Sequence, residues 1–200
     1  AGGTFQPGTS TVVFTDASRP SIISGSTTFY QFASLPPTKV RQFEAGATQT
    51  ILGTWTIRGA YAQHVRLVST APGSRWLVDP RGPRDLTYAW VEDSINLDPE
   101  KIIMTESTNR GNSIGWDPTG TWNGAANGAW SSGANWLGLG GAAPGAGDDV
   151  VFDGTKNTNS SIDASFTGTV NSVSMNTGYT RTITNNRTGG LTVNGTFTVN

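Results

Sequence analysis

The segment TQTILGTWTI (residues 48–57) has a close counterpart near the other end of the chain, GLTVNGTFTV (residues 190–199). In both segments, apolar residues alternate with threonine on either side of a central glycine. Alternation with a period of two predicts strands with one buried face, and the glycine predicts a tight turn between them. The matching positions are Gly53 and Gly195, Trp55 and Phe197, and Ile57 and Val199. The same strand, turn and strand therefore occur twice.

A second pair of segments repeats in the same way. Residues 10–34 begin STVVF and residues 148–175 begin DDVVF, and further short strand-like runs follow in both. The aligned residues are Val12, Val13 and Phe14 in the first segment and Val150, Val151 and Phe152 in the second. Repetition of this kind favours a solenoid, in which each coil covers its neighbour, whereas a sandwich has no need of it.

We therefore expect an all-β fold, a parallel β-helix or β-solenoid-like stack built from two similar blocks, residues 1–116 and 117–200. Tandem β-sandwich domains are the alternative. Only residues 95–106 leave room for a helical turn. The shared apolar phase of the two blocks predicts that the following side chains point inward: Phe14, Ile51, Trp55, Ile57, Val151, Phe152, Val193 and Phe197.

Composition limits the classes of function. The chain of 200 residues has 26 glycines and only 14% charged residues, and 13 basic residues against 14 acidic ones leave a net charge of −1. A chain without basic excess lacks the electrostatic footprint of a nucleic-acid-binding protein. No apolar run is long enough to span a bilayer, so we expect no membrane span. The absence of cysteine excludes disulfides and thiol catalysis.

One segment resembles a known family. The stretch GAWSSGANWLGLGGAAPGAGDDVVFDGT (residues 128–155) is similar to the W…NW…P…GDDVVF motif of autotransporter-associated and giant adhesin repeats of bacterial surface proteins. The resemblance implies a secreted protein at the cell surface and a right-handed parallel β-helix. It also implies an adhesive or structural role without catalysis.

The two ends of the sequence read as one continuous pattern. When LTVNGTFTVN (residues 191–200) is written before AGGTFQPGTSTVVF (residues 1–14), strand, turn and strand follow one another without interruption. We expect the second block to continue into the first block of a neighbouring copy, giving a homo-oligomer or filament. The residues expected at this assembly interface are Gly3, Phe5, Val12, Val193, Phe197 and Val199.

Three aspartates form the candidate metal site. Asp148, Asp149 and Asp153 lie close together beside glycines, and calcium prefers several carboxylate and carbonyl oxygens. Their spacing matches no known calcium loop, and aspartates that form turns are the alternative. Apart from this calcium ion, no cofactor is expected.

The candidate glycan site is a group of aromatic residues. Trp122, Trp130 and Trp136, with Asn135, could stack on a sugar and donate amide hydrogen bonds if the rings are exposed; Trp116 lies nearby. The alternative is that these rings pack over the junction between the two blocks. His64, the single histidine, is expected on the outer face of its strand.

A charged segment invites comparison with β-helix polysaccharide lyases, which combine acidic residues with arginine or lysine. Asp79, Arg81, Arg84 and Asp85 lie among prolines and a glycine, which favours ion pairs on an exposed loop. We therefore expect a structural repeat of a fibre, sheath or adhesin stalk without enzymatic activity. The alternatives are a carbohydrate-binding adhesin module and a β-helix lyase or hydrolase.

Overall fold

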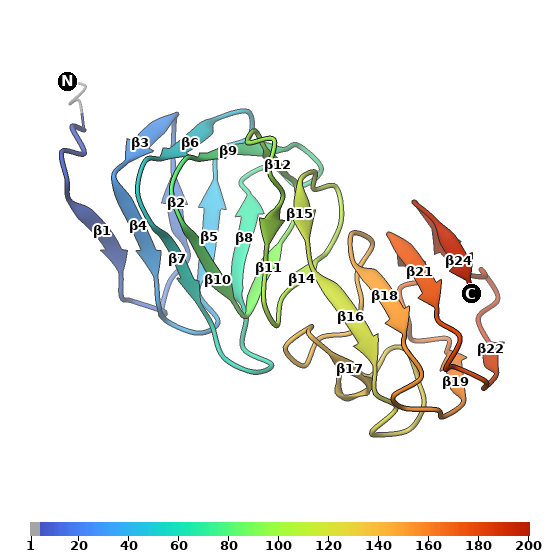
Figure 1. Ribbon diagram of the computed structural model, residues 1–200. Helices are drawn as coiled ribbons and strands as arrows, with labels where there is room; N and C mark the ends of the chain where they lie inside the picture. The colour runs from blue at the N-terminus through green and yellow to red at the C-terminus, as the bar shows by residue number, and fades with distance from the viewer. Residues whose placement is uncertain (1–4) are drawn as a thin grey trace.

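The computed structural model describes residues 5–200 and confirms an all-β fold (Figure 1). The predicted interface residue Gly3 lies outside the described residues. In the part of the chain that is described, the only helix is a three-residue 3-10 turn, η1 (Gly133–Asn135). Residues 95–106, which left room for a helical turn, instead contribute to short strands, as expected for a segment that contains Asp98-Pro99.

The first block is a stack of coils, each of which passes through three parallel sheets. Every third strand pairs in parallel, so the strand numbers rise by three across each sheet. The first sheet contains β1 (Thr11–Phe14), β4 (Gln31–Ser34), β7 (Trp55–Arg58) and β10 (Arg84–Thr87). The second contains β2 (Ser21–Ile23), β5 (Val40–Phe43), β8 (Val65–Ser69), β11 (Ala89–Val91) and β14 (Thr108–Asn109). The third contains β3 (Thr27–Phe29), β6 (Thr48–Ile51), β9 (Trp76–Pro80) and β12 (Ser94–Asn96).

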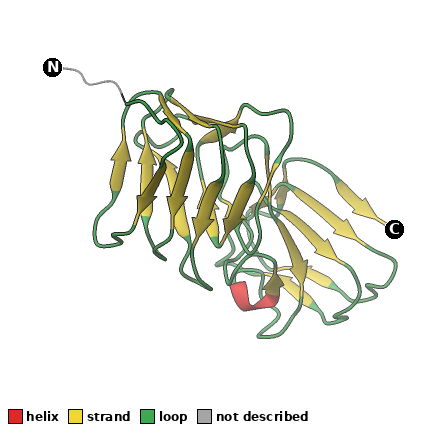
Figure 2. Cartoon of the chain, turned by 60° about the vertical axis from the view of Figure 1, so that its left-hand side comes forward, coloured by secondary structure: helices red, strands yellow, loops and turns green. Residues whose placement is uncertain are grey.

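The second block repeats this arrangement with fewer coils. A short pair, β13 (Ile102–Ile103) with β15 (Trp116–Asp117), precedes it. Its largest sheet contains β16 (Thr119–Trp122), β17 (Trp136–Leu137), β18 (Asp149–Phe152), β21 (Ser172–Met175) and β24 (Phe197–Val199). Its two smaller sheets pair β19 (Ser160–Ile162) with β22 (Ile183–Asn185), and β20 (Thr169–Val170) with β23 (Thr192–Val193). Only β17 runs antiparallel to its partner. Figure 2 shows the first and the last strand, β1 and β24, at opposite ends of the stack.

The repeated sequence segments occupy equivalent places in the two blocks. The turn between β6 and β7 places the Gly53 N–H 2.5 Å from the Tyr30 carbonyl oxygen. In the turn between β23 and β24, the Gly195 N–H donates a hydrogen bond of 2.6 Å to the Asn171 carbonyl oxygen. In each turn, a β-carbon added to the glycine would come too close to the same carbonyl oxygen, which belongs to the preceding coil. The repeat in the sequence is therefore a repeat of coil geometry.

The interior contains two apolar clusters. In the sequence, the buried residues of the first cluster end at Trp116 and those of the second begin at Trp122. Of the residues predicted to point inward, Ile51, Trp55, Ile57 and Phe152 are buried, and Phe14 and Val193 are half-buried against the clusters. The prediction is wrong for Val151, because Val150 and Phe152 take the inner face and the residue between them must face outward. Phe197 is 57% exposed, because no coil of the described chain covers it.

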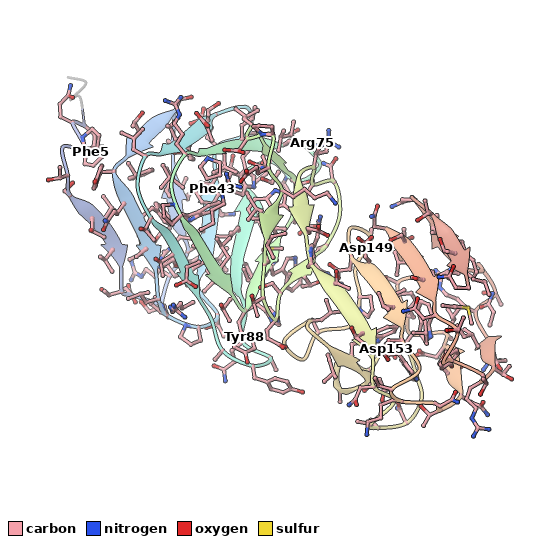
Figure 3. All side chains as sticks on the ribbon, viewed as in Figure 1. Phe5, Phe43, Arg75, Tyr88, Asp149 and Asp153 are labelled. Atoms are coloured by element: carbon pink, nitrogen blue, oxygen red, sulfur yellow. The ribbon has the colours of Figure 1, made fainter. Side chains whose placement is uncertain are left out.

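Phe5 lies outside any strand of the described residues. Within residues 5–200, the first strand begins at Thr11. The ring of Phe5 instead packs against Phe29, with the centroids 5.9 Å apart, and remains half exposed (Figure 3). Phe5 therefore covers part of the first coil, and β1 provides the free strand edge at this end of the stack.

Candidate functional site

The tryptophan cluster is the core of the second block, so its assignment to a glycan site is wrong. Trp122, Trp130 and Trp136 are all buried, and Trp116 is buried in the first cluster. The ring of Trp136 packs edge-on against both Trp122 and Trp130, at centroid distances of 5.1 and 5.2 Å. The faces that would stack on a sugar are therefore occupied by other aromatic rings.

Asn135 is also fully buried, and its hydrogen bonds fix the long segment that connects β16 to β18. Its Oδ1 accepts a hydrogen bond of 2.7 Å from the Ala126 N–H. Its Nδ2 donates to the Ala129 carbonyl oxygen at 2.8 Å and to Asn127 Oδ1 at 3.1 Å. No polar atom of this side chain points at solvent, so Asn135 is a structural residue rather than a sugar ligand.

Asp148 is fully buried at the junction of the two blocks. Its Oδ2 accepts hydrogen bonds from Thr108 Oγ1 at 2.5 Å and from the Gly145 N–H at 2.7 Å, and its Oδ1 accepts one from the Asn109 N–H at 2.6 Å. Burial raises the pKa of the carboxyl group to about 7, although these donors act to lower it. All of its oxygens thus bind the protein itself.

The other two aspartates point to different partners. Asp149 Oδ1 accepts from Asn171 Nδ2 at 2.6 Å and from Ser172 Oγ, and Asp153 Oδ1 accepts from the Thr155 N–H at 2.9 Å. Figure 3 shows Asp149 and Asp153 at opposite ends of β18. Residues 5–200 contain no group of three or more acidic, histidine or cysteine side chains able to hold a metal ion. The structure therefore does not bring Asp148, Asp149 and Asp153 together as the ligands of one calcium ion.

His64 is buried, contrary to the expectation that it faces solvent. Its Nε2 lies 3.1 Å from the Leu139 carbonyl oxygen, and Gly140, the next residue, donates its N–H to Glu106 Oε2 at 3.0 Å. The glycine-rich segment 138–147 thus crosses the coils of the first block. The sequence could not show this, because the covering segment lies far along the chain.

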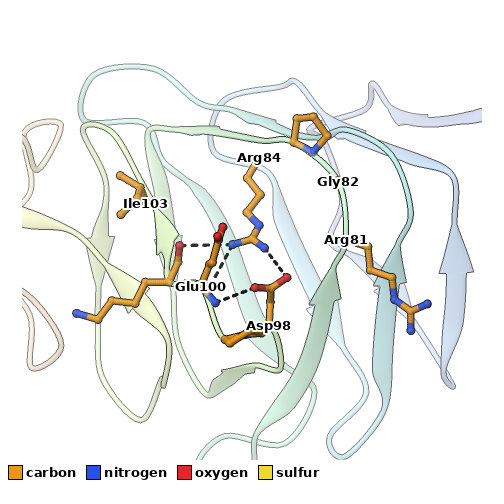
Figure 4. A pocket seen from close by; sticks show the side chains of 9 residues that line it. Arg81, Gly82, Arg84, Asp98, Glu100 and Ile103 are labelled. Atoms are coloured by element: carbon orange, nitrogen blue, oxygen red, sulfur yellow. Dashed lines mark hydrogen bonds and ion pairs between the residues drawn. The ribbon is translucent and has the colours of Figure 1, made fainter.

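A pocket of about 560 Å³ lies on the flank of the first block (Figure 4). Arg84 lines it and forms an ion pair of 2.7 Å with Asp98, and it also donates to the Pro80 and Glu100 carbonyl oxygens. The four charged residues singled out in the sequence do form ion pairs: Arg81 with Asp79, Arg84 with Asp98, and Asp85 with Arg58. Arg84 and Asp85 lie in strand β10 rather than in a loop.

The last strand presents an open edge. β24 pairs with β21 on one side only, and Phe197 and Val199 are 57% and 67% exposed. Val193, on β23, is half-buried and lies beside Val170 of β20 in the parallel ladder. At the other end of the stack, Val12 is half-buried on β1. Of the residues assigned to assembly, those on β1, β23 and β24 thus lie in strands at the two ends of the stack.

Two buried cations were not singled out in the sequence. Lys39 and Arg41 are 2% and 0% exposed and lie on the same face of the chain as buried Phe43. The alternation of KVRQF places all three on one side, so the pattern itself contained this signal.

Comparison with protein families, with curated proteins and with solved structures finds no match for this chain. The part of the chain that is described holds no helix long and apolar enough to cross a bilayer.

Proposed function

We propose that this protein is an extracellular structural module, without enzymatic activity, that extends a fibre, sheath or adhesin stalk by adding coils at the β24 edge. The next coil comes either from the same polypeptide or from a second copy. The observation that supports this most directly is the exposure of core-facing residues on the last strand.

The register of the last strand shows which way its side chains point. Phe197 lies beside Val173 and Val199 beside Met175 in the parallel ladder between β21 and β24. Val173 is buried in the second cluster, so Phe197 shares the core-facing phase. A further coil would cover both apolar residues of β24 in the way that β24 covers β21.

An apolar hollow opens beside this strand. It has a volume of about 330 Å³, and its lining includes Val173, Met175, Ile183, Leu191 and Phe197. Burying apolar surface contributes about 25 cal/mol per Å². Covering this hollow with a further coil would therefore stabilise the assembly.

The backbone of β24 is also open on one side. Asn200 donates its N–H to the Met175 carbonyl oxygen, and the Thr196 carbonyl accepts from the Val173 N–H, both at 2.9 Å. In a parallel ladder, alternate residues face the same neighbour, so the N–H and C=O groups of Phe197 and Val199 face away from β21. These groups can pair with a strand of the next coil.

Sedimentation velocity and negative-stain microscopy over a range of protein concentrations test this proposal. The wild type is expected to form linear particles that lengthen with concentration. Val199→Lys should shorten them, because it places a charge at the core-facing edge. Thr198→Lys is the matched control: it adds the same charge one residue away on the outer face and should leave the particles unchanged.

A fusion of two copies in tandem tests the covalent version. Its melting temperature should exceed that of a single copy, because the second copy covers the β24 edge of the first. Monodisperse monomers at all concentrations, together with an unchanged melting temperature of the fusion, would contradict the proposal in both forms.

A β-helix polysaccharide lyase or hydrolase is a second candidate, favoured by the charged pocket of Figure 4, whose lining includes Arg84, Asp98, Glu100 and Lys101. Against it, the Arg84 guanidinium is held by its ion pair and by backbone carbonyls. Incubation with acidic polysaccharides should release no unsaturated or reducing ends. Release that disappears in Arg84→Ala would support the lyase or hydrolase instead.

A further inference from the structure

A second pocket lies where the two blocks meet, and we call it the junction pocket. Its volume is about 350 Å³, at the lower end of the roughly 300–1,000 Å³ typical of ligand sites. Its lining includes Arg75, Lys101 and Ile114 of the first block and Asn171 and Asn194 of the second. Of the described residues that line it, two are cations, four are asparagines and none is acidic.

Hydrogen bonds between residues of the lining hold the pocket in shape. The Gly147 N–H of the second block donates to the Asn109 carbonyl oxygen of the first at 3.0 Å. Asn194 Nδ2 donates to the Ala146 carbonyl oxygen at 3.1 Å, which joins coils of the second block. A site that is formed before the ligand arrives loses less conformational freedom when it binds.

Arg75 brings an unpaired charge to this pocket. Its Nε donates to the Asn112 carbonyl oxygen at 2.9 Å, and this is the only hydrogen bond of its side chain within residues 5–200. None of the ion pairs in the described part of the chain includes Arg75. The terminal amino groups of Arg41 are buried without partners, whereas those of half-buried Arg75 are not enclosed in this way. They therefore contact solvent, and a ligand in the pocket can reach them.

The carboxylates around the pocket have other partners. Asp93 is buried, and its oxygens accept from the Gly73 N–H at 2.8 Å and from Asn112 Nδ2 at 2.6 Å. Asp117 forms an ion pair of 3.4 Å with Lys101, the second cation of the lining. The guanidinium described above is therefore the charge that a ligand can neutralise.

Two asparagines of the second block offer acceptors that suit hydroxyl groups. Asn171 and Asn194 lie in neighbouring coils, where the Gly195 N–H donates to the Asn171 carbonyl oxygen. Asn171 Nδ2 donates to Asp149 Oδ1 at 2.6 Å, and Asn194 Nδ2 donates to the Ala146 carbonyl oxygen. Within residues 5–200, no group donates to Oδ1 of either asparagine. Each of these oxygens can accept a hydrogen bond from a ligand hydroxyl.

We propose that the junction pocket binds a sugar unit that carries a carboxylate, as in an acidic polysaccharide. The planar fork of the Arg75 guanidinium matches the two oxygens of a carboxylate. The amide oxygens of Asn171 and Asn194 accept from the sugar hydroxyls. Ile114, which is 51% exposed, offers an apolar surface to the C–H groups of the ring. A simple anion would use only the guanidinium, and a neutral sugar only the other groups.

The site does not depend on the proposed assembly. The pocket is complete within one chain, and its lining includes no residue of β24, the edge to which a further coil would add. In a fibre the pocket would recur once in every copy. A long acidic polysaccharide could then occupy several pockets together, and its overall affinity would exceed that of a single pocket.

Isothermal titration of the wild type with trigalacturonate tests the ligand class. A neutral galactose trisaccharide and sodium sulfate, at the same ionic strength, are the comparison ligands. We expect one site per chain for trigalacturonate. The neutral trisaccharide should bind about tenfold more weakly or less, because it lacks the charge-assisted hydrogen bonds to the guanidinium. Sulfate should also bind more weakly, because it lacks the sugar ring. Equal binding of either comparison ligand, or no binding of trigalacturonate, would overturn the proposal.

Variants locate the binding in the junction pocket. Arg75→Gln should weaken trigalacturonate binding about tenfold or more, while its amide can still donate to the neighbouring backbone carbonyl. Asn194→Ala should weaken it by a smaller factor. Arg58→Gln is the matched control, because it removes an exposed arginine elsewhere on the first block and should bind like the wild type. Unchanged binding in Arg75→Gln would overturn the proposal.

A further variant separates this proposal from that of assembly. Val199→Lys, which is expected to shorten the particles, leaves the lining of the junction pocket intact and should bind trigalacturonate like the wild type. Absence of particles with normal binding would count against assembly alone. Normal particles without binding would count against the sugar site alone.

Discussion

The backbone N–H of Asn109, in the first block, donates a hydrogen bond of 2.6 Å to Oδ1 of Asp148, the residue before strand β18 of the second block. Thr108 donates to the other carboxylate oxygen. The two blocks are therefore joined by a fully buried carboxyl group as well as by the chain between them.

Asp148 is expected to make stability fall as pH rises. Its pKa is raised from 3.8 to about 7 by burial, so between these values the folded state holds a proton that the unfolded state releases. The free energy of unfolding of the wild type, relative to Asp148→Asn, should therefore decrease from about pH 4 to about pH 7 and level off above. Urea titrations of both proteins at several pH values measure this difference, and a flat or rising difference would contradict it.

His64, unlike Asp148, is expected to make the stability of the protein fall as pH falls. Burial lowers its pKa below 6.5, while Glu106 acts to raise it and Arg110 to lower it. Below pH 6.5 the unfolded state gains a proton that the folded state does not, so stability is lost as pH falls. His64→Gln can still donate to the Leu139 carbonyl but does not titrate, and its unfolding free energy should lack this decrease. An identical pH dependence in both proteins would refute the assignment.

Trp55 and Trp130 belong to different apolar clusters. Each is almost completely buried, so Trp55→Ala and Trp130→Ala should each lower the unfolding free energy by about 3–5 kcal/mol. Trp90→Ala is the control, because the Trp90 ring is half-exposed between Arg66 and Arg110 and its loss should cost far less. Chemical denaturation measures all three. A change below about 1 kcal/mol for Trp55→Ala would place that ring on the surface.

Gly82 is a position where coils approach closely. A β-carbon there would lie 2.2 Å from the Gly53 carbonyl oxygen and 2.8 Å from the Gly53 α-carbon, so the backbone would have to shift. Gly82→Ala should therefore destabilise the protein by about 1–3 kcal/mol or more. At Gly189 the closest atoms belong only to the flexible end of Arg187, and Gly189→Ala should cost less. Equal melting temperatures for the two variants would argue against coil stacking at Gly82.

Removal of divalent cations should leave the fold unchanged. The carboxylates of Asp148, Asp149 and Asp153 accept hydrogen bonds from different protein groups, and the structure does not bring them together. We expect the same melting temperature with EDTA and with added calcium. A rise with calcium that EDTA reverses would show that a cation site exists after all.

The sequence by itself determined the class of fold and the phase of most strands. Alternation with a period of two places one residue inside and the next outside, as Trp55, Thr56 and Ile57 show. The matching turns at Gly53 and Gly195 followed from the repeat, because a coil that stacks on its neighbour needs a small residue where the two backbones meet.

Only the tertiary structure decided what covers each inward face. The periodic pattern gives the direction of a side chain but not the segment that lies opposite it, which can come from anywhere in the chain. His64 is buried by residues near Leu139, the tryptophan rings by one another, and Asp148 by the first block, whereas core-facing Phe197 remains exposed because no coil of the described chain lies above it. The burial of a residue depends on the neighbours that folding brings to it. The chemistry of each candidate site in turn depends on that burial.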